Sequence, residues 1–366
     1  MKRRDFLKNA GPLTLAAGVA APLATPALAQ SMPEVNWRLV SSFPANLDVL
    51  YGCSTTLAET VAEITEGKFK IQTFSAGEIV PGLQAFDAAA NGTVEVAHSA
   101  SYYYTGKDPA FALGTHVPFM LSTRQQMAWA EQGEGREMLA EFYDGYGVVA
   151  FPGGNTSTQM GGWFRKEIAS LDDLKGLKFR ISGLGGRVLE KLGAVPQQIA
   201  ISDIYPSLER GTIDAAEFNG PYDDEKLGLY RVAPHYYYPG FWDGTSMQHF
   251  FVGKSAWEQL PEGYKGAFKA AAAKVQVTSI ARYDTLNPAA LRRLVANGAQ
   301  LHSFPVEILD AAYDATMEIY EGLAAENPWF DKMWKSQLAF QRDVTTWNQV
   351  SELAYDQVVL RELRRG

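Results

Sequence analysis

The sequence predicts an α/β protein made of two lobes, and two observations lead to this prediction. Strand-like and helix-like segments alternate over residues 35–98 and again over residues 148–218. Such alternation is typical of parallel βαβ units, in which helices cover the faces of a mainly parallel sheet. The chain has 366 residues, more than one domain usually contains, so two sheets are expected rather than one.

The first α/β stretch shows both the alternation typical of strands and the steps of three and four typical of helices. Its expected elements are a strand over 35–43, a helix over 50–64, a strand over 69–74, a helix over 81–91 and a strand over 94–98. Apolar residues of the first helix recur at steps of three and four, which indicates one buried face. Cys53 falls on that face, so we expect it to pack in the core. Gly67 and Gly92 follow the two helices, as glycine often does.

The second α/β stretch repeats this plan. Its expected elements are strands over 148–151, 177–181 and 213–218 and helices over 186–192 and 204–210. Residues 91–97 resemble residues 210–216, because each segment is a helix end followed by Gly-Thr and a strand. This short repeat is what two lobes built on one plan would leave. Beyond about residue 261 the pattern is mainly helical, with a late apolar stripe at Trp347, Val350, Ala354 and Val358.

The first 29 residues have the pattern of an export signal. Basic residues at positions 2–4 precede a mild apolar run over 10–24 and a small-residue cleavage motif at 27–29. The paired arginines followed by Phe-Leu-Lys are typical of the twin-arginine route. A membrane anchor is the alternative, but the run is short and interrupted by prolines. We therefore expect a soluble periplasmic protein.

Composition and charge exclude several classes of function. Hydrophobic residues make up 46% and charged residues 20%, which favours a globular protein over a disordered one. The net charge is −8, and residues 30–366, with 29 basic and 40 acidic residues, carry −11. Nucleic acid is therefore not an expected partner. Cys53 is the single cysteine, so neither an intrachain disulfide nor a multi-cysteine metal site can form.

Motifs of catalysis and of cofactor binding are absent from the sequence. None of the five histidines lies within five residues of another, and there is no Gly-x-Ser-x-Gly or Walker motif. Residues 183–186 are glycine-rich but lack the third glycine of a dinucleotide-binding fingerprint. The sequence therefore gives no sign of an enzyme.

Two segments favour the binding of a small anion. Residues 153–165 contain four glycines together with Asn155 and Gln159, so backbone and amide groups can approach a small polar ligand closely. A simple crossing between domains would explain the same composition. Arg180 ends a predicted strand and points away from its apolar side, where its planar guanidinium could hold a carboxylate. A surface ion pair is the alternative for Arg180.

Acidic residues and tyrosines favour a bound cation nearby. Glu217 lies at the end of a predicted strand, and Asp243 lies in a glycine-flanked loop after an aromatic run. Oxygen ligands of this kind suit a hard cation such as sodium or calcium. The tyrosines at 102–104 could add hydroxyl groups from the first lobe, although tyrosines in a row also serve in packing.

Four segments carry a resemblance to a known family. They are residues 74–84, 151–165, 171–180 and 211–224, and the runs Phe-Pro-Gly-Gly-Asn-Thr and Gly-Pro-Tyr-Asp-Asp-Glu-Lys-Leu-Gly are the most specific. The chain resembles the solute-binding receptors of tripartite ATP-independent periplasmic (TRAP) transporters over essentially its whole length. It is most similar to the branch that binds 2-oxo acids with a sodium ion.

The resemblance implies a two-lobed periplasmic solute-binding protein fold with a hinge and a long connecting helix. The first lobe would contain residues 30–157 and about 246–285. The second lobe would contain residues 158–245 and about 286–340. Residues 341–366 would form a C-terminal helix exchanged within a homodimer.

The resemblance also assigns roles to the residues that bind the ligand. Arg180 matches the residue that forms a salt bridge with the substrate carboxylate, and Asn155 and Tyr103 match hydrogen-bonding partners of the substrate. Gln159, Glu217 and the main-chain carbonyl of Phe218 match the cation ligands.

Two positions differ from that branch of the family. It has Trp at the position of Phe218 and Glu at the position of Asp243. These smaller side chains could widen the pocket, change the choice of cation, or favour a 2-hydroxy acid.

The implied function is capture of a small, pyruvate-like 2-oxo monocarboxylate with a sodium ion and its delivery to the TRAP membrane subunits. One alternative is a 2-hydroxy acid such as lactate, bound with calcium. Another is a periplasmic enzyme using Glu217 and Arg180, which the absence of a nucleophile–base pair disfavours. A sensory receptor that docks a signalling protein is a third alternative.

Overall fold

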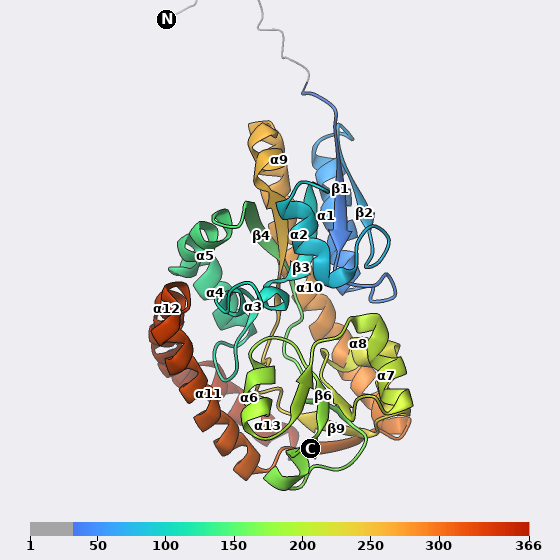
Figure 1. Cartoon of the computed structure of the whole chain (residues 1–366), viewed down its shortest axis with the longest axis vertical. Coiled ribbons are helices and arrows are strands. Elements are labelled where there is room, and N and C mark those ends of the chain that lie inside the picture. The colour runs from blue at the N-terminus through green and yellow to red at the C-terminus, as the bar shows by residue number, and fades with distance from the viewer. Residues whose placement is uncertain (1–31, 366) are drawn as a thin grey trace, which may run out of the picture. The chain divides into compact units, whose positions relative to one another are not determined.

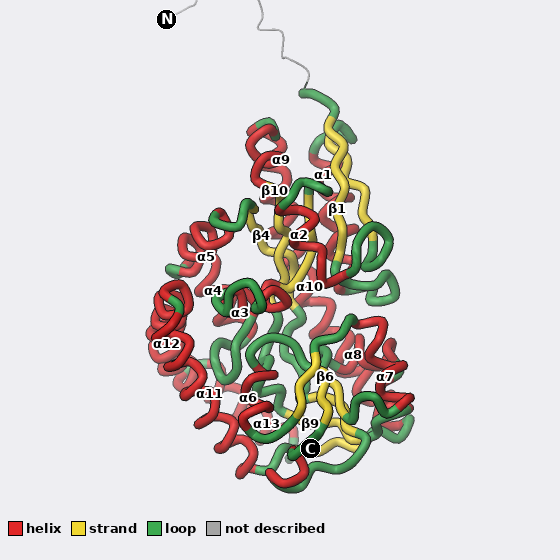
Figure 2. Tube along the Cα trace, in the orientation of Figure 1, coloured by secondary structure: helices red, strands yellow, loops and turns green. Residues whose placement is uncertain are grey.

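The strands of the computed structural model form two separate sheets, and the model describes residues 32–365 (Figure 1). The predicted export signal over residues 1–29 lies outside the described residues. Figure 2 shows the strands gathered in two groups, with helices around them. No helix among residues 32–365 has the length and apolar character needed to cross a membrane.

The first sheet is mainly parallel and has the strand order β2-β1-β3-β10-β4. Its strands are β1 (Val35–Ser41), β2 (Phe69–Phe74), β3 (Val96–Ala100), β4 (Val148–Asn155) and β10 (Met247–Gly253). β1 pairs in parallel with β2 and β3, whereas β10 is antiparallel to both of its neighbours. The sheet is therefore completed by a strand that returns from the second half of the chain.

Helices cover this sheet, as the alternating pattern predicts. They are α1 (Leu50–Ile64), α2 (Ala85–Ala90), α3 (Phe111–Thr115), α4 (Thr123–Gln132), α5 (Gly135–Asp144) and α9 (Lys254–Gln259). On α1, the buried side chains include Leu50, Cys53, Leu57 and Val61, which are the steps of three and four read from the sequence. Cys53 is buried in the core, as predicted. We call this sheet and its helices the first lobe.

The second lobe contains six short strands in the order β11-β9-β5-β8-β6-β7. They are β5 (Gly162–Phe164), β6 (Lys178–Arg180), β7 (Val195–Gln197), β8 (Ala215–Ala216), β9 (His235–Tyr238) and β11 (Gln300–Ser303). Its helices include α6 (Gly185–Lys191), α7 (Ile204–Arg210) and α8 (Pro221–Leu227). β6, β7 and β8 are parallel, and β5 is antiparallel to β8 and β9. β8 is shorter than the strand predicted over 213–218, although the N–H groups of Asp214 and Glu217 on either side of it still donate to main-chain carbonyls of β6.

Two loop segments and one long helix connect the lobes. Residues 156–161 lead from β4 to β5, and residues 239–246 lead back from β9 to β10. The backbone N–H of Thr156 donates to the Ser246 carbonyl at 3.1 Å, so these two crossovers lie side by side. The third connection is α10 (Glu262–Ala296), which packs against α1 and β4 in the first lobe and against α8 in the second.

The C-terminal helices also pack against helices of both lobes. α11 (Val306–Glu326) packs on α6, whereas α12 (Pro328–Val350) packs on α3, α4 and α5. The predicted apolar stripe is divided at Ser351, because Trp347 and Val350 belong to α12 while Ala354 and Val358 belong to α13 (Glu352–Leu363). The lobe boundaries given by the resemblance stay a prediction.

Asp48, in the loop between β1 and α1, connects the two lobes through side chains. Its carboxylate pairs with Lys226 of α8 and with Arg282 of α10, and it accepts a hydrogen bond from the Tyr222 hydroxyl at 3.2 Å. Burial alone raises the pKa of Asp48, but hydrogen bonding to Lys226 and the two positive charges bring it below the usual value. The side chain is 46% exposed, so solvent weakens these pairs.

We expect Asp48→Asn to lower the melting temperature of the ligand-free protein slightly, because exposed pairs of this kind contribute about 1 kcal/mol or less. The decrease in melting temperature should be largest at low salt and should become smaller as salt screens the charges. It should also vanish in acid, as the pH falls through the lowered pKa of Asp48. Asp172→Asn, which removes an exposed pair with Lys175 within one lobe, is the matched control. Equal melting temperatures of Asp48→Asn and wild type at low salt would contradict the role given to Asp48.

Candidate functional site

The predicted site residues lie where strands of the two sheets end. Asn155 is the last residue of β4, Arg180 is the last residue of β6, and Glu217 follows β8 directly. Tyr103 lies in the short helical turn that follows β3. The carboxyl ends of strands are where open α/β sheets bind ligands. The chain topology thus brings these side chains toward the junction of the lobes.

Arg180 is a buried cation with an incomplete set of partners. Its side chain is 2% exposed and that of Glu217 is 1% exposed. Nη1 donates to the main-chain carbonyl of Glu217 and to its Oε2 at 3.3 Å, and Nη2 donates to the Ser182 hydroxyl at 3.2 Å. Within the described part of the chain, Nε has no hydrogen-bond partner. The guanidinium can therefore donate to a further group.

Burial opposes ionisation of the two carboxyl groups at this site. It raises the pKa of Glu217 to about 8, although the charge of Arg180 acts in the opposite direction. Burial and the neighbouring charge of Glu217 raise the pKa of Asp243 well above its usual value. A cation placed near both groups would favour their ionised forms.

Three side-chain oxygens at the site are buried without a hydrogen-bond partner among residues 32–365. They belong to Gln159 (Oε1), Glu217 (Oε1) and Asp243 (Oδ1). Carboxylate and amide oxygens are the ligands that sodium and calcium prefer, so the chemistry of these groups fits a hard cation. No group of three or more His, Cys, Asp or Glu side chains within the described residues could hold a metal ion. A cation at this site must therefore also use amide or main-chain oxygens.

The amide of Asn155 is oriented by its surroundings. Its Oδ1 accepts the backbone N–H of Ser157 and the hydroxyl of Thr245, both at 2.8 Å. Because a backbone N–H can only donate, the oxygen end of this amide is assigned without ambiguity. The Nδ2 group is buried and lacks an acceptor in the part of the chain that the structure describes. Asn155 therefore offers a hydrogen-bond donor, as a partner of a substrate oxygen should.

A cavity of about 290 Å³ opens beside Arg180 and Tyr103. Its remaining lining comes from both lobes and is mostly apolar, including Pro44 and Leu83 on one side and Ile199 and Ile201 on the other. The main-chain carbonyl of Tyr103 accepts a hydrogen bond from Gln198 Nε2 at 3.2 Å, which joins the lobes at this point. Burial raises the pKa of Tyr103 to about 12, so its hydroxyl stays protonated and can donate.

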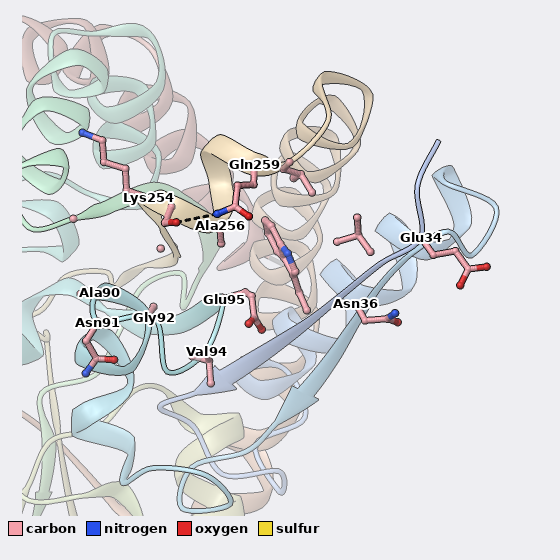
Figure 3. A pocket seen from close by; sticks show the side chains of 17 residues that line it. Glu34, Asn36, Ala90, Asn91, Gly92, Val94, Glu95, Lys254, Ala256 and Gln259 are labelled. Carbon is pink, nitrogen blue, oxygen red and sulfur yellow. Dashed lines mark hydrogen bonds between the residues drawn. The ribbon is translucent and has the colours of Figure 1, made fainter. Parts of the chain in front are cut away.

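A larger cavity of about 840 Å³ lies elsewhere in the first lobe, between the start of β1, the turn before β3, and α9 (Figure 3). None of the predicted site residues lines it. Two of its charged side chains are already paired, Glu95 with Arg38 at 3.0 Å and Lys254 with Asp144 at 2.6 Å. Its size alone therefore does not make it a candidate ligand site.

Sequence reasoning missed several polar neighbours of the site. His116 Nδ1 lies 3.5 Å from Asp243 Oδ1, and burial lowers the pKa of His116 to about 4, which keeps the ring neutral. Tyr102, which sequence reasoning treated only as one of three tyrosines in a row, lies beside Asp243. Thr156, the last residue of the Gly-Gly-Asn-Thr run, contacts Gln159. In the sequence, only this run indicated that Thr156 could belong to the site.

Two α/β lobes joined by paired crossovers and a long helix, with polar groups and a cavity at their junction, define a solute-binding protein. Comparison with known families agrees, because residues 40–327 match the model of bacterial extracellular solute-binding protein family 7, DctP. The chain belongs to this family. The resemblance to the TRAP receptors and the predicted two-lobed fold are thus confirmed.

Close relatives support this assignment over nearly the whole chain. A monocarboxylate 2-oxoacid-binding periplasmic protein of Nostoc sp. is 44% identical over 97% of this chain and 98% of its own length. A TRAP solute-binding protein of Bordetella bronchiseptica, solved with calcium and picolinate, is 46% identical, with a TM-score of 0.89 over 91% of this chain and 99% of that one. One of Pseudoalteromonas atlantica, solved with sodium and pyruvate, is 36% identical, with a TM-score of 0.86 over 88% of this chain and 99% of that one.

Asp224, close to the site, provides a test of the electrostatics. Its Oδ2 accepts hydrogen bonds from Trp163 Nε1 at 2.9 Å and from the Tyr236 hydroxyl at 2.7 Å, while burial raises its pKa to about 7. The folded protein should therefore hold a proton here that the unfolded chain releases above about pH 4.

We expect the stability advantage of wild type over Asp224→Asn to be greater at about pH 5 than at about pH 8, because only wild type gains stability by binding this proton. Urea unfolding of both ligand-free proteins at each pH measures the difference. Groups that do not interact with Asp224 titrate alike in the two proteins and cancel. Loss of the Asp224 charge also lowers the raised pKa of Glu217 in the variant, which changes the difference in the same direction. A difference that does not change with pH would show that Asp224 titrates normally.

Proposed function

We propose that this protein captures a small, pyruvate-like 2-oxo monocarboxylate together with a sodium ion in the periplasm and delivers it to the membrane subunits of a TRAP transporter. The observation that carries the proposal is the buried guanidinium of Arg180, which has an unused donor and lines a cavity between the lobes. A buried cation of this kind is stable only with an anionic partner. Glu217 supplies that partner in part, and a bound carboxylate would complete it.

The charges at the site favour a cation as a companion of the substrate. Burial favours the protonated form of Glu217, whereas the charge of Arg180 and that of a bound cation favour the ionised form. When Glu217 is ionised and Asp243 is protonated, Arg180 and Glu217 balance each other. An incoming carboxylate then leaves one negative charge, which a sodium ion neutralises. If Asp243 is ionised as well, a divalent ion such as calcium gives the same neutral balance. The protonation of Asp243 is thereby linked to the choice of ion.

Each side chain receives a distinct role in this proposal. Arg180 pairs with the substrate carboxylate, while the hydroxyl of Tyr103 and the Nδ2 group of Asn155 donate hydrogen bonds to the substrate. The cation would be held by Gln159, Glu217 and the main-chain carbonyl of Phe218. A 2-oxo acid suits this arrangement because a carboxylate oxygen and the keto oxygen can bind one cation together. Phe218 and Asp243 would shape the pocket beside it.

The relatives support this ligand class. The Nostoc protein is named for 2-oxoacid binding, and the Pseudoalteromonas protein was solved with sodium and pyruvate. A second candidate ligand is a 2-hydroxy acid such as lactate, bound with calcium. The smaller side chains of Phe218 and Asp243 favour this alternative, whereas calcium alone does not distinguish the two ligand classes, because it accompanies picolinate in the Bordetella protein and pyruvate in a relative of Colwellia psychrerythraea. We infer a receptor and no enzyme, because the sequence offers no nucleophile–base pair and Glu217 and Arg180 can serve in binding alone.

We also propose that the protein is a homodimer held by its C-terminal segment. Large apolar side chains are exposed along the end of α12 and along α13 in the single chain. They include Trp347 at 64%, Val350 at 73%, Tyr355 at 69% and Leu363 at 74% exposure. Apolar side chains gathered in this way are typical of protein interfaces. The Bordetella relative was solved as a dimer. Export by the twin-arginine route remains part of the proposal, supported by the pattern of residues 1–29.

We expect Arg180→Ala to weaken pyruvate binding by about 100-fold or more, because the variant leaves the carboxylate buried without its partner. Arg180→Lys should bind with intermediate affinity, since it keeps the charge but loses the planar fork. Titration calorimetry at saturating sodium measures both. Arg187→Ala, which alters an exposed arginine of α6, is the control. Unchanged affinity in Arg180→Ala would refute the proposed carboxylate site.

The cation role of Glu217 makes a separate prediction. Wild-type protein that has been chelated and exchanged into sodium-free buffer should bind pyruvate weakly, and added sodium or calcium should restore tight binding. Glu217→Ala should respond much less to either ion, because it lacks a carboxylate oxygen at the site. Glu209→Ala, at an exposed glutamate of α7, should respond as wild type does. Equally tight binding with and without ions would rule out the cation.

A further inference from the structure

The hydroxyl of Thr156 uses all of its hydrogen-bonding capacity. It accepts the backbone N–H of Ser246 at 2.9 Å and the Nε2 group of Gln159 at 2.8 Å, and it donates to the Ser157 carbonyl at 3.2 Å. Thr156, Gln159 and Ser246 are all buried. A hydroxyl has one hydrogen and two acceptor lone pairs, so these three bonds satisfy it completely.

This arrangement fixes which end of the Gln159 amide faces Thr156. The Ser246 N–H can only donate, and the single hydroxyl hydrogen of Thr156 is directed to the Ser157 carbonyl. The remaining lone pair must therefore meet a donor, which is the Gln159 Nε2 group. It follows that Gln159 Oε1 lies on the side of the amide away from Thr156.

That oxygen is left without a partner. Gln159 Oε1 is buried and accepts no hydrogen bond from any residue between 32 and 365. Leaving a buried polar atom unsatisfied is unfavourable, so the site is built for a group that the chain itself does not supply. The segment is also held beyond Gln159, since the Met160 N–H donates to the Asn219 carbonyl at 2.9 Å. The orientation of the amide is therefore set before a ligand arrives.

We propose that Thr156 is a positioning residue that turns the Gln159 amide oxygen toward the bound cation. The inference rests on the proposed function, in which Gln159 is a cation ligand. Thr156 belongs to the crossover over residues 156–161, and its partner Ser246 belongs to the crossover over residues 239–246. The Thr156 hydroxyl thus links Gln159, the proposed cation ligand, to both crossovers between the lobes.

A consequence is that cation affinity depends on how the two crossovers are paired. The Ser246 N–H occupies one lone pair of Thr156 only while the crossovers lie side by side. If they separate, that lone pair becomes free and the hydroxyl can rotate, so the orientation of the Gln159 amide is no longer determined. Because coupling between two equilibria is reciprocal, a bound cation should in turn favour the paired crossovers.

The test compares Thr156→Val, which has nearly the same shape but no hydroxyl, with Thr156→Ser, which keeps it. Calcium chloride alone is titrated into chelated, ligand-free protein, with calorimetry and thermal shift as readouts. Pyruvate affinity is then measured at low and at saturating calcium. Thr316→Val is the matched control, because Thr316 is a buried threonine on α11 that donates to the Ala312 carbonyl.

Thr156→Val should raise the Kd for calcium by about tenfold or more, as loss of a residue that orients a metal ligand usually does. Its pyruvate affinity should fall at low calcium and recover at saturating calcium. Thr156→Ser and Thr316→Val should both behave as wild type. If Thr156→Val does not fold, Thr156→Ala takes its place in the experiment.

An unchanged calcium Kd in Thr156→Val would overturn the inference. So would a pyruvate affinity that falls equally at every calcium concentration, because that result indicates a merely structural role. Gln159→Leu separates this inference from the proposed function. If Gln159→Leu loses the calcium response while Thr156→Val keeps it, only the role of Thr156 is wrong. If wild type shows no calcium or sodium response, the proposed cation site itself is wrong.

Discussion

The burial of Arg180 beside Glu217 is the interaction on which the rest of the site depends. Each charge would be expensive to bury alone, and each stabilises the other at the junction of the lobes. The pair does not satisfy all of its atoms, because Arg180 Nε and Glu217 Oε1 have no hydrogen-bond partner among the described residues. In the proposed function, a carboxylate and a cation supply the complementary groups together. The site would then accept an anion because it accepts a cation at the same time.

The neighbouring amides show how the same side-chain chemistry is given two uses. Asn155 has its oxygen occupied and presents a donor, whereas Gln159 has its nitrogen occupied and presents an acceptor. The surrounding hydroxyl and backbone groups impose the two orientations. Both amides are held by hydroxyl groups of the two crossovers, so the groups proposed to contact the ligand are tied to the connections between the lobes.

Local sequence patterns predicted much of the fold and the types of residue at the site. The spacing of Leu50, Cys53, Leu57 and Val61 predicted the buried face of α1, and alternation predicted that Arg180 would end a strand. The roles assigned to the residues of the site came from the resemblance to a known family, because no local sequence pattern contains that information. The position of β10 between β3 and β4, the pairing of Asp48 with Lys226, and the contact of Tyr102 with Asp243 depend on distant parts of the chain. Periodicity carries no information on such long-range pairing.

The return of β10 to the first sheet has a consequence for how the molecule is made. Its residues pair with β3 on one side and β4 on the other, yet almost the whole second lobe lies between β4 and β10 in the chain. During synthesis the first sheet cannot be completed until β10 leaves the ribosome, about a hundred residues after β4. The first sheet is therefore completed only after most of the second lobe has been synthesised, and a nascent chain halted before Met247 would expose the edges of β3 and β4 to chaperones or to aggregation.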